Sequence, residues 1–280
     1  VINQKYKNWE LIFWDNFSTD RSSKILNSYK DKRIKYFLSE EFTSLGKARN
    51  LALKKVSGEF VAFLDCDDLW HPDKLKKQIP FFKDKKVGLV ISNTIFFGEN
   101  YKSKVLYKKS PPQGYIFGEL LEAYFISLET AIVRFSSLKR LNEFFDNRFE
   151  VIEEFDLFLR ISLQYKLAYT NEILGKWRIH QNSLTWKNKE LFPLESKLFL
   201  DKIKTQYPEA AFKYTKQLYK FKMNIKYQEF LIFWENQKLN EKRKLFNKYI
   251  FNSRKLLAVY IISFFITFKL FEFLKNKIMY

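Results

Sequence analysis

The sequence predicts an α/β protein with a mostly parallel, doubly wound sheet flanked by helices and a helical extension at its C-terminus. Two observations support this fold class. Apolar segments rich in β-forming residues alternate with helical segments through residues 1–186, which is typical of βαβ units. Beyond residue 186, long Lys- and Phe-rich helical segments contain scarcely any Gly or Pro.

The expected elements follow this alternation along the chain. A short strand at 11–14 leads into a helix that ends near Tyr29, with Ser18 or Asp20 as its N-cap. The remaining segments are a strand at 33–37, a helix at 46–56, a strand at 60–64, an amphipathic helix at 72–83, a strand at 87–92, a basic loop at 102–113, a short strand at 130–133 and a helix within 149–164.

The charge balance narrows the class of partner. The chain carries 50 Lys and Arg against 31 Asp and Glu, a net charge of +19 that favours nucleic acid, nucleotide-linked substrates or an anionic membrane. The sequence contains no zinc-finger spacing, RNP-type signature or basic-region heptad, so we expect no nucleic-acid partner. The single cysteine, Cys66, excludes an internal disulfide framework and fits a reducing cytoplasm.

The C-terminal region contains an apolar run at 256–268 with basic residues on both sides. A membrane-spanning helix needs roughly 20 apolar residues, and this run is shorter. The basic flanks and abundant Phe favour a helix over 254–277 that lies in the membrane interface. The alternative is a buried helix that packs on the main domain.

Three carboxylates, Asp65, Asp67 and Asp68, follow directly after the apolar segment 60–64. In open α/β sheets, ligands bind at the carboxyl ends of the strands, so these side chains are expected at a binding crevice. Clustered carboxylates repel one another unless a cation lies between them, and Mg²⁺ or Mn²⁺ favours oxygen ligands and substrate phosphates. The pattern therefore indicates a metal-diphosphate site, or alternatively an N-cap and turn cluster.

Four motifs in order resemble those of the family 2 glycosyltransferases, which have a GT-A (Rossmann-like) fold. They lie at 3–10, 15–20 (Asp-Asn-x-Ser-Thr-Asp), 46–50 (Gly-Lys-Ala-Arg-Asn) and 58–70, and the resemblance covers about two thirds of the chain, to Ser183. The resemblance implies transfer of a sugar from a nucleotide-diphosphate donor to an acceptor hydroxyl, with inversion at the anomeric carbon. It also places Val1 after the family's first strand and nucleotide-binding loop, so an N-terminally truncated domain is expected at 1–186.

The resemblance assigns roles on the donor side. Asp15 would contact the base, Arg49 would lie in the donor-binding helix, and Asp65 and Asp67 would contact the ribose and the divalent metal, Mg²⁺ or Mn²⁺, with Asp68 beside them. For Arg49 the alternative is a structural ion pair. Asn16 stands where the family usually has Asp, which weakens one possible donor contact.

The resemblance also assigns a base and a closing segment. Inverting transfer needs a carboxylate that removes the acceptor's proton. The family places it in an acidic pair before an Asp-Leu-x-Leu-Arg helix, here Glu153 and Glu154, although a solvated first helical turn remains the alternative. In the segment 177–183, Arg178 would pair with the diphosphate, and His180 would be a metal contact or simply a packed or surface residue.

The resulting hypothesis is a metal-dependent enzyme with a helical extension at 187–280. Its partners would be a nucleotide-sugar donor, a glycan or lipid-linked acceptor and an anionic membrane surface. It would act in the cytoplasm, peripherally at the inner face of the membrane, in surface-polysaccharide synthesis. The alternative is a noncatalytic, basic, membrane-associated binding protein on a decayed transferase fold.

Overall fold

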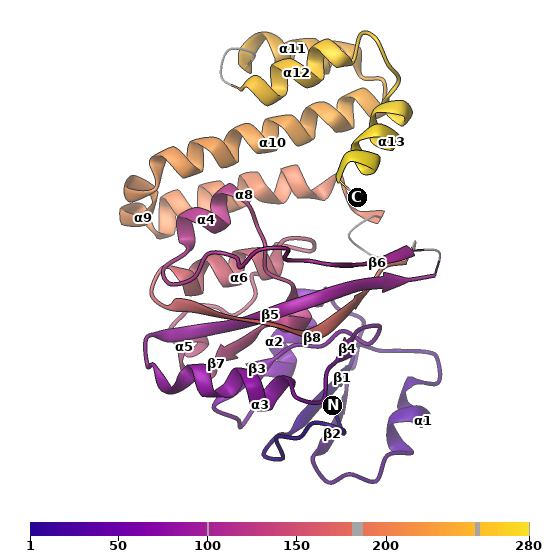
Figure 1. The fold of residues 1–280 in the computed structure, drawn as a ribbon, viewed down its shortest axis with the longest axis vertical. Coiled ribbons are helices and arrows are strands. Elements are labelled where there is room, and N and C mark those ends of the chain that lie inside the picture. Colours follow the sequence, from indigo (N-terminus) through magenta and orange to yellow (C-terminus); the bar gives the residue numbers. More distant parts are fainter. Residues whose placement is uncertain (100, 181–186, 250–252, 280) are drawn as a thin grey trace. The chain divides into compact units, whose positions relative to one another are not determined.

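The computed structural model describes residues 1–99, 101–180, 187–249 and 253–279 (Figure 1). The chain divides into two compact units, Val1–Lys187 and Asn188–Tyr280. The first unit contains the sheets, and the second contains helices.

The first unit begins with a small parallel sheet. Strand β1 (Leu11–Asp15) pairs with β2 (Ile34–Leu38), and the short helix α1 (Ser22–Asn27) connects them. Helix α2 (Leu45–Leu53) follows, and the Ser44 side chain caps it by accepting a hydrogen bond from the backbone N–H of the third helical residue. This arrangement confirms the expected strand–helix–strand–helix order.

A second sheet forms the centre of this unit, with strand order β3-β7-β5-β8-β4 and β6 paired to β5. Its strands are β3 (Phe60–Ala62), β4 (Leu69–Trp70), β5 (Val87–Gly98), β6 (Tyr101–Val105), β7 (Ile132–Arg134) and β8 (Lys166–Arg178). Within it only β5 and β8 run parallel, and the other described pairs are antiparallel. The expected mostly parallel pairing is therefore wrong for this sheet, because an alternating pattern identifies strands without giving their direction.

Short helices connect these strands. They are α3 (Lys74–Gln78), the 3₁₀ helix η1 (Ile79–Lys83), α4 (Phe117–Glu122), the 3₁₀ helix η2 (Leu128–Thr130), α5 (Phe135–Lys139) and α6 (Glu153–Ser162). The predicted helix at 72–83 is thus a short α-helix continued as 3₁₀. Neither Asp67 nor Asp68 caps it, because its N-cap residue is Asp73.

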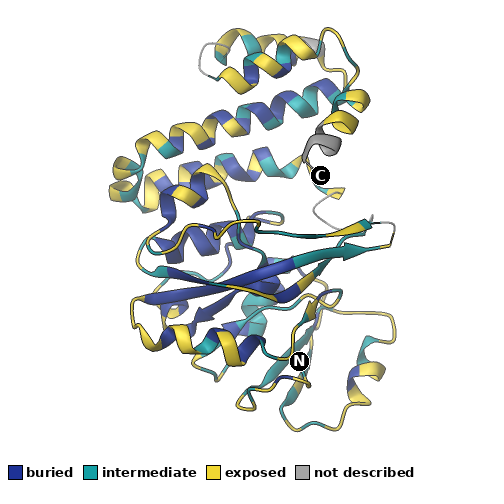
Figure 2. Ribbon diagram, viewed as in Figure 1, coloured by how far each residue is buried: buried dark blue, intermediate teal, exposed yellow. Residues whose placement is uncertain are grey.

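The core of this unit lies between the central strands and α6 (Figure 2). Val90 and Ile91 of β5 are completely buried, as are Leu157, Phe158 and Leu159 of α6. A strand buried on both faces and a helix with a wide apolar face hold each other rigidly. The N-terminal turn of α6, which carries the acidic pair, is therefore attached to a firm support.

The second unit consists of α8 (Leu191–Gln206), α9 (Pro208–Lys213), α10 (Thr215–Glu235), α11 (Leu239–Tyr249), α12 (Arg254–Ile262) and α13 (Phe268–Met279). Leu256 and Val259 of α12 pack in one core cluster with Phe230 and Trp234 of α10. The expected single helix over 254–277 is corrected to two helices, α12 and α13, because Thr267 supplies N-terminal hydrogen bonds to a new helix. Across the described residues, every helix is too short or too polar to cross a membrane.

Candidate active site

The carboxylate loop connects β3 to β4. The backbone N–H of Asp68 donates to the carbonyl of Asp65 at 3.1 Å, which closes a tight turn. The side chains of Asp65 and Asp67 are 49% and 41% exposed, whereas the residue Asp68 is only 8% exposed. The first two carboxylates can therefore meet a ligand, and the third faces inward.

Strand β8 contacts the carboxylate loop through Arg178. The backbone N–H of Arg178 donates to Asp68 Oδ1 at 2.8 Å, and its Nε donates to the carbonyl oxygen of Asp67 at 2.9 Å. The Arg178 guanidinium also lies 4.4 Å from the ring centroid of Phe97. These contacts make Arg178 a clamp on the loop, and the diphosphate contact implied by the resemblance stays a prediction.

His180 meets the loop at its exposed carboxylate. Its Nε2 lies 2.9 Å from Asp67 Oδ2, and both side chains are about two-fifths exposed, at 39% and 41%. The structure thus brings together the two residues that were assigned to the metal, although they are 113 positions apart in the sequence. Residues 181–183 of the closing segment lie outside the described residues.

This pair fits a divalent cation that is shared with a substrate. The described part of the chain contains no group of three or more His, Cys, Asp or Glu that could hold a metal alone. Mg²⁺ usually takes one or two protein carboxylates and completes its shell with substrate phosphates and water. Burial raises the pKa of Asp68 to about 8, so that carboxyl is mostly protonated near neutral pH and serves as a loop anchor.

Arg49 of α2 connects the loop to the acidic pair. Its Nη1 donates to Glu153 Oε1 at 2.7 Å, and its Nη2 donates to Asp65 Oδ1 at 3.1 Å. Burial alone would lower the pKa of Arg49, but Asp65, Glu153 and Glu154 raise it, so the guanidinium stays charged. Arg49 therefore forms the structural ion pair that was its alternative role, and a donor contact stays a prediction.

Glu153 and Glu154 have different surroundings. Glu153 is 5% exposed and is held by Arg49, whereas Glu154 is more open and accepts a hydrogen bond from the Tyr124 hydroxyl at 3.2 Å. Desolvation, followed by the charge of Glu153, raises the pKa of Glu154 to about 8. A carboxylate with that pKa is a stronger base than an ordinary glutamate. Glu153 is thus the partner of Arg49, and the role of Glu154 as the proton acceptor stays a prediction.

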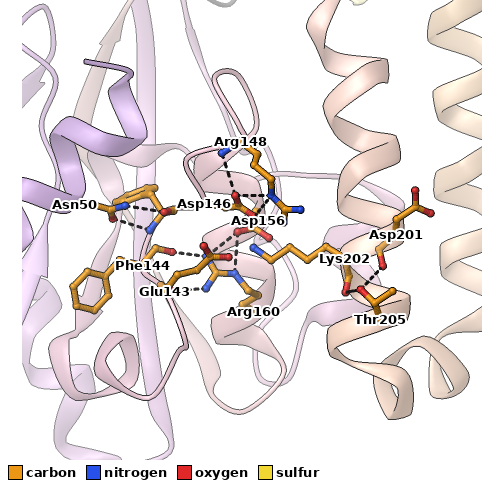
Figure 3. Close-up of polar contacts among 11 residues, drawn as sticks. Asn50, Glu143, Phe144, Asp146, Arg148, Asp156, Arg160, Asp201, Lys202 and Thr205 are labelled. Carbon is orange, nitrogen blue, oxygen red and sulfur yellow. Dashed lines mark hydrogen bonds and ion pairs between the residues drawn. The ribbon is translucent and has the colours of Figure 1, made fainter. Parts of the chain in front are cut away.

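Polar contacts through the loop at 143–145 connect helix α6 to helix α2 (Figure 3). Arg160 pairs with Asp156 at 2.7 Å, with both side chains fully buried, and its Nη1 donates to the carbonyl of Glu143 at 2.7 Å. In the same loop, Phe145 exchanges two backbone hydrogen bonds with the Asn50 side chain, at 2.8 and 2.9 Å. Because Asn50 follows Arg49 directly, this loop couples α6 to α2.

Asp15 lies at the end of β1 and is 2% exposed. Its Oδ1 accepts the Ser18 N–H and its Oδ2 accepts the Tyr36 hydroxyl, each at 2.8 Å. Burial alone would raise the pKa of Asp15, but these hydrogen bonds lower it, so the group is ionised. Burial and the charges of Asp65, Asp67 and Asp15 raise the pKa of the Cys66 thiol.

Comparisons with known proteins agree with this architecture. The family model described as "Glycosyl transferase family 2" matches residues 1–142. The chain belongs to glycosyltransferase family 2. It is 31% identical over 194 residues to the UDP-Glc:alpha-D-GlcNAc-diphosphoundecaprenol beta-1,3-glucosyltransferase WfgD of Escherichia coli, covering 68% of this chain and 74% of WfgD.

Solved structures confirm the GT-A fold. The structure of S. aureus TarS 1-349 with UDP-GlcNAc superposes with a TM-score of 0.61 at 21% identity, covering 72% of this chain and 60% of TarS 1-349. The mannosyltransferase PcManGT from Pyrobaculum calidifontis, with GDP-Man and Mn²⁺, gives a TM-score of 0.61 at 15% identity, covering 94% and 72%. The predicted family and the predicted α/β, GT-A fold are both confirmed, apart from the strand directions in the central sheet.

Proposed function

We propose that this protein transfers a sugar from a nucleotide-diphosphate donor to an acceptor hydroxyl, with inversion at the anomeric carbon. The observation that carries the proposal is the position of Arg49, which bonds to Glu153 of the acidic pair and to Asp65 of the carboxylate loop. One side chain therefore connects Glu153, the neighbour of the candidate base, to the candidate donor loop. An acceptor between them would face both the base and the donor.

On the donor side, Asp67 and His180 would hold Mg²⁺ or Mn²⁺, with Asp65 at the ribose and Asp15 at the base. The PcManGT structure contains Mn²⁺ together with its nucleotide sugar, which supports a divalent ion here. When bound, the cation would neutralise negative charge on the departing diphosphate. The Arg178 clamp keeps the Asp67 backbone in place for this contact.

On the acceptor side, Glu154 would remove the hydroxyl proton while the oxygen attacks the anomeric carbon opposite the departing diphosphate. A single direct displacement inverts the configuration and needs one base. The Tyr124 hydroxyl donates to Glu154 Oε1 and so orients the carboxylate. The positive charge of Arg49 stabilises the ionised form of Glu154.

We further propose a lipid-linked or other glycan acceptor at the cytoplasmic face of a membrane, where the enzyme is bound peripherally. The name of WfgD describes a diphosphoundecaprenol-linked acceptor, which supports this class of substrate for a relative of this chain. Synthesis of a surface polysaccharide is the corresponding role. The comparisons give no support to a noncatalytic protein on a decayed fold, because the name of WfgD is that of a glucosyltransferase.

Calorimetric titration of UDP and GDP, with and without Mn²⁺, tests the donor site. We expect one nucleotide to bind tightly only with Mn²⁺, and Asp67→Asn to weaken that binding about tenfold or more. Asp84→Asn, which changes an exposed carboxylate elsewhere in the same unit, should bind like the unmodified protein. Metal-independent binding, or equal binding by Asp67→Asn, would contradict the proposed site.

A further inference from the structure

An apolar surface lies at the junction of α12 and α13, which we term the α12–α13 edge. Phe265 is 81% exposed and Phe264 is 63% exposed, although large aromatic side chains are usually buried. Further exposed apolar residues of the edge are Ile261, Ile262, Leu270 and Leu274. Figure 2 shows exposed residues on α12 and on the first part of α13.

This exposure is not the result of a poorly packed helix. The opposite face of α12 is buried, with Leu256 at 0% and Val259 at 3% exposure. The turn after α12 is also anchored, since Lys242 donates to the Ser263 hydroxyl at 3.1 Å and the ring of Tyr260 packs 4.9 Å from that of Phe264. The helix already has its core contacts, so the phenylalanines of the edge are not needed for them.

The surroundings of the edge are strongly basic. Residues 238–280 contain ten Lys and Arg but only two acidic residues, Glu241 and Glu272. Among them Arg243, Lys244 and Lys269 are exposed. A second copy of this chain is a poor partner for this surface, because each copy carries a net charge of +19 and the two would repel. An anionic surface complements both the charge and the apolar side chains.

We propose that the α12–α13 edge binds the surface of an anionic lipid bilayer, with Phe264 and Phe265 inserted among the acyl chains and the basic side chains at the lipid phosphates. Helices of this kind lie in the interface plane, which is consistent with the shortness and polarity of the described helices. This inference rests on the proposed function in one respect only: membrane binding would keep the transferase beside a lipid-linked acceptor. The binding itself requires neither donor nor catalysis.

Co-sedimentation with vesicles tests this surface. We expect the protein to bind vesicles of phosphatidylglycerol and phosphatidylcholine, to bind pure phosphatidylcholine far more weakly, and to dissociate as salt is added. The double variant Phe264→Ser/Phe265→Ser should lower the partition coefficient about tenfold or more. Phe212→Ser is the matched control, because Phe212 of α9 is 86% exposed but lies outside the edge.

Both variants are first checked for unchanged circular dichroism and unchanged Mn²⁺-dependent nucleotide binding. This check separates loss of membrane binding from failure of the proposed donor site. The proposal is overturned if the double variant binds anionic vesicles as well as Phe212→Ser does. It is also overturned if the unmodified protein does not bind anionic vesicles. In that case, sedimentation equilibrium shows whether the edge mediates dimers, and hydrogen exchange shows whether the first unit covers it.

Discussion

The pH dependence of catalysis tests the assignment of Glu154 as the base. Desolvation and the neighbouring charge of Glu153 raise the pKa of Glu154 to about 8. A base accepts a proton only when it is deprotonated, so kcat/KM should rise with pH, by about tenfold per unit, and level off above about pH 8. With that pKa, about one tenth of the enzyme is active at neutral pH.

Two neighbours of Glu154 influence its pKa, and each can be changed by mutation. Arg49 and the Tyr124 hydroxyl both lower the pKa of Glu154, with Arg49 the larger influence. Arg49→Met should therefore move the midpoint of the profile upward by about one unit, and Tyr124→Phe should move it upward by less. Arg49→Lys keeps the positive charge and should retain most of the original midpoint.

The assay is the initial rate of nucleotide-diphosphate release at low donor concentration, measured from about pH 6 to pH 10 at constant ionic strength. A kcat/KM that stays constant across this range, as a glutamate with an ordinary pKa of about 4.3 would give, would refute the assignment. A shift toward acid in Arg49→Met would refute the proposed electrostatic coupling, because loss of a nearby positive charge must disfavour the carboxylate.

Four further predictions concern single side chains. Arg160→Met should lower the free energy of unfolding by about 3–5 kcal/mol in urea titrations, because it removes the guanidinium of a fully buried ion pair, and a loss below about 1 kcal/mol would contradict this. Phe17→Gly should raise Tm by removing about 1 kcal/mol of backbone strain, since Phe17 has φ 68°, and an unchanged or lower Tm would be inconsistent with that strain. Burial lowers the pKa of Lys74 to about 7, so the folded state binds fewer protons than the unfolded state above that pH. Stability should therefore rise by up to about 1.4 kcal/mol per pH unit toward pH 10 in the unmodified protein, and Lys74→Met should lose this slope in denaturation curves. His180→Ala should raise the Mn²⁺ concentration for half-maximal activity about tenfold or more, and an unchanged metal requirement would exclude His180 as a ligand.

Much of the fold could be predicted because its signals are local. The alternation of apolar strands and helices identified β1, β2, α2 and β5, and the apolar run before the carboxylates identified β3. Strand β6 was expected to be loop because Lys102 and Lys104 dominate it, yet lysines are common on edge strands. Strand β8 was missed because Asn171 and Glu172 interrupt its apolar run where it leaves the buried part of the sheet.

The site was only partly predictable for a similar reason. Asp156 and Arg160 stand four residues apart on one helix, so their pairing could have been anticipated from the sequence. The hydrogen bond from Tyr124 to Glu154 depends on how α4 packs beside α6, which no local pattern encodes. The bridge from Arg49 to both Glu153 and Asp65 likewise requires three distant segments to meet.

The most direct test of the proposed mechanism is the activity of Glu154→Gln compared with its donor affinity. If Glu154 is the base, this variant should lose transfer by about a thousandfold or more while binding the nucleotide and Mn²⁺ as the unmodified protein does. Glu119→Gln, at an exposed position on α4, should change neither property. Transfer by Glu154→Gln within about tenfold of the unmodified rate would contradict the account.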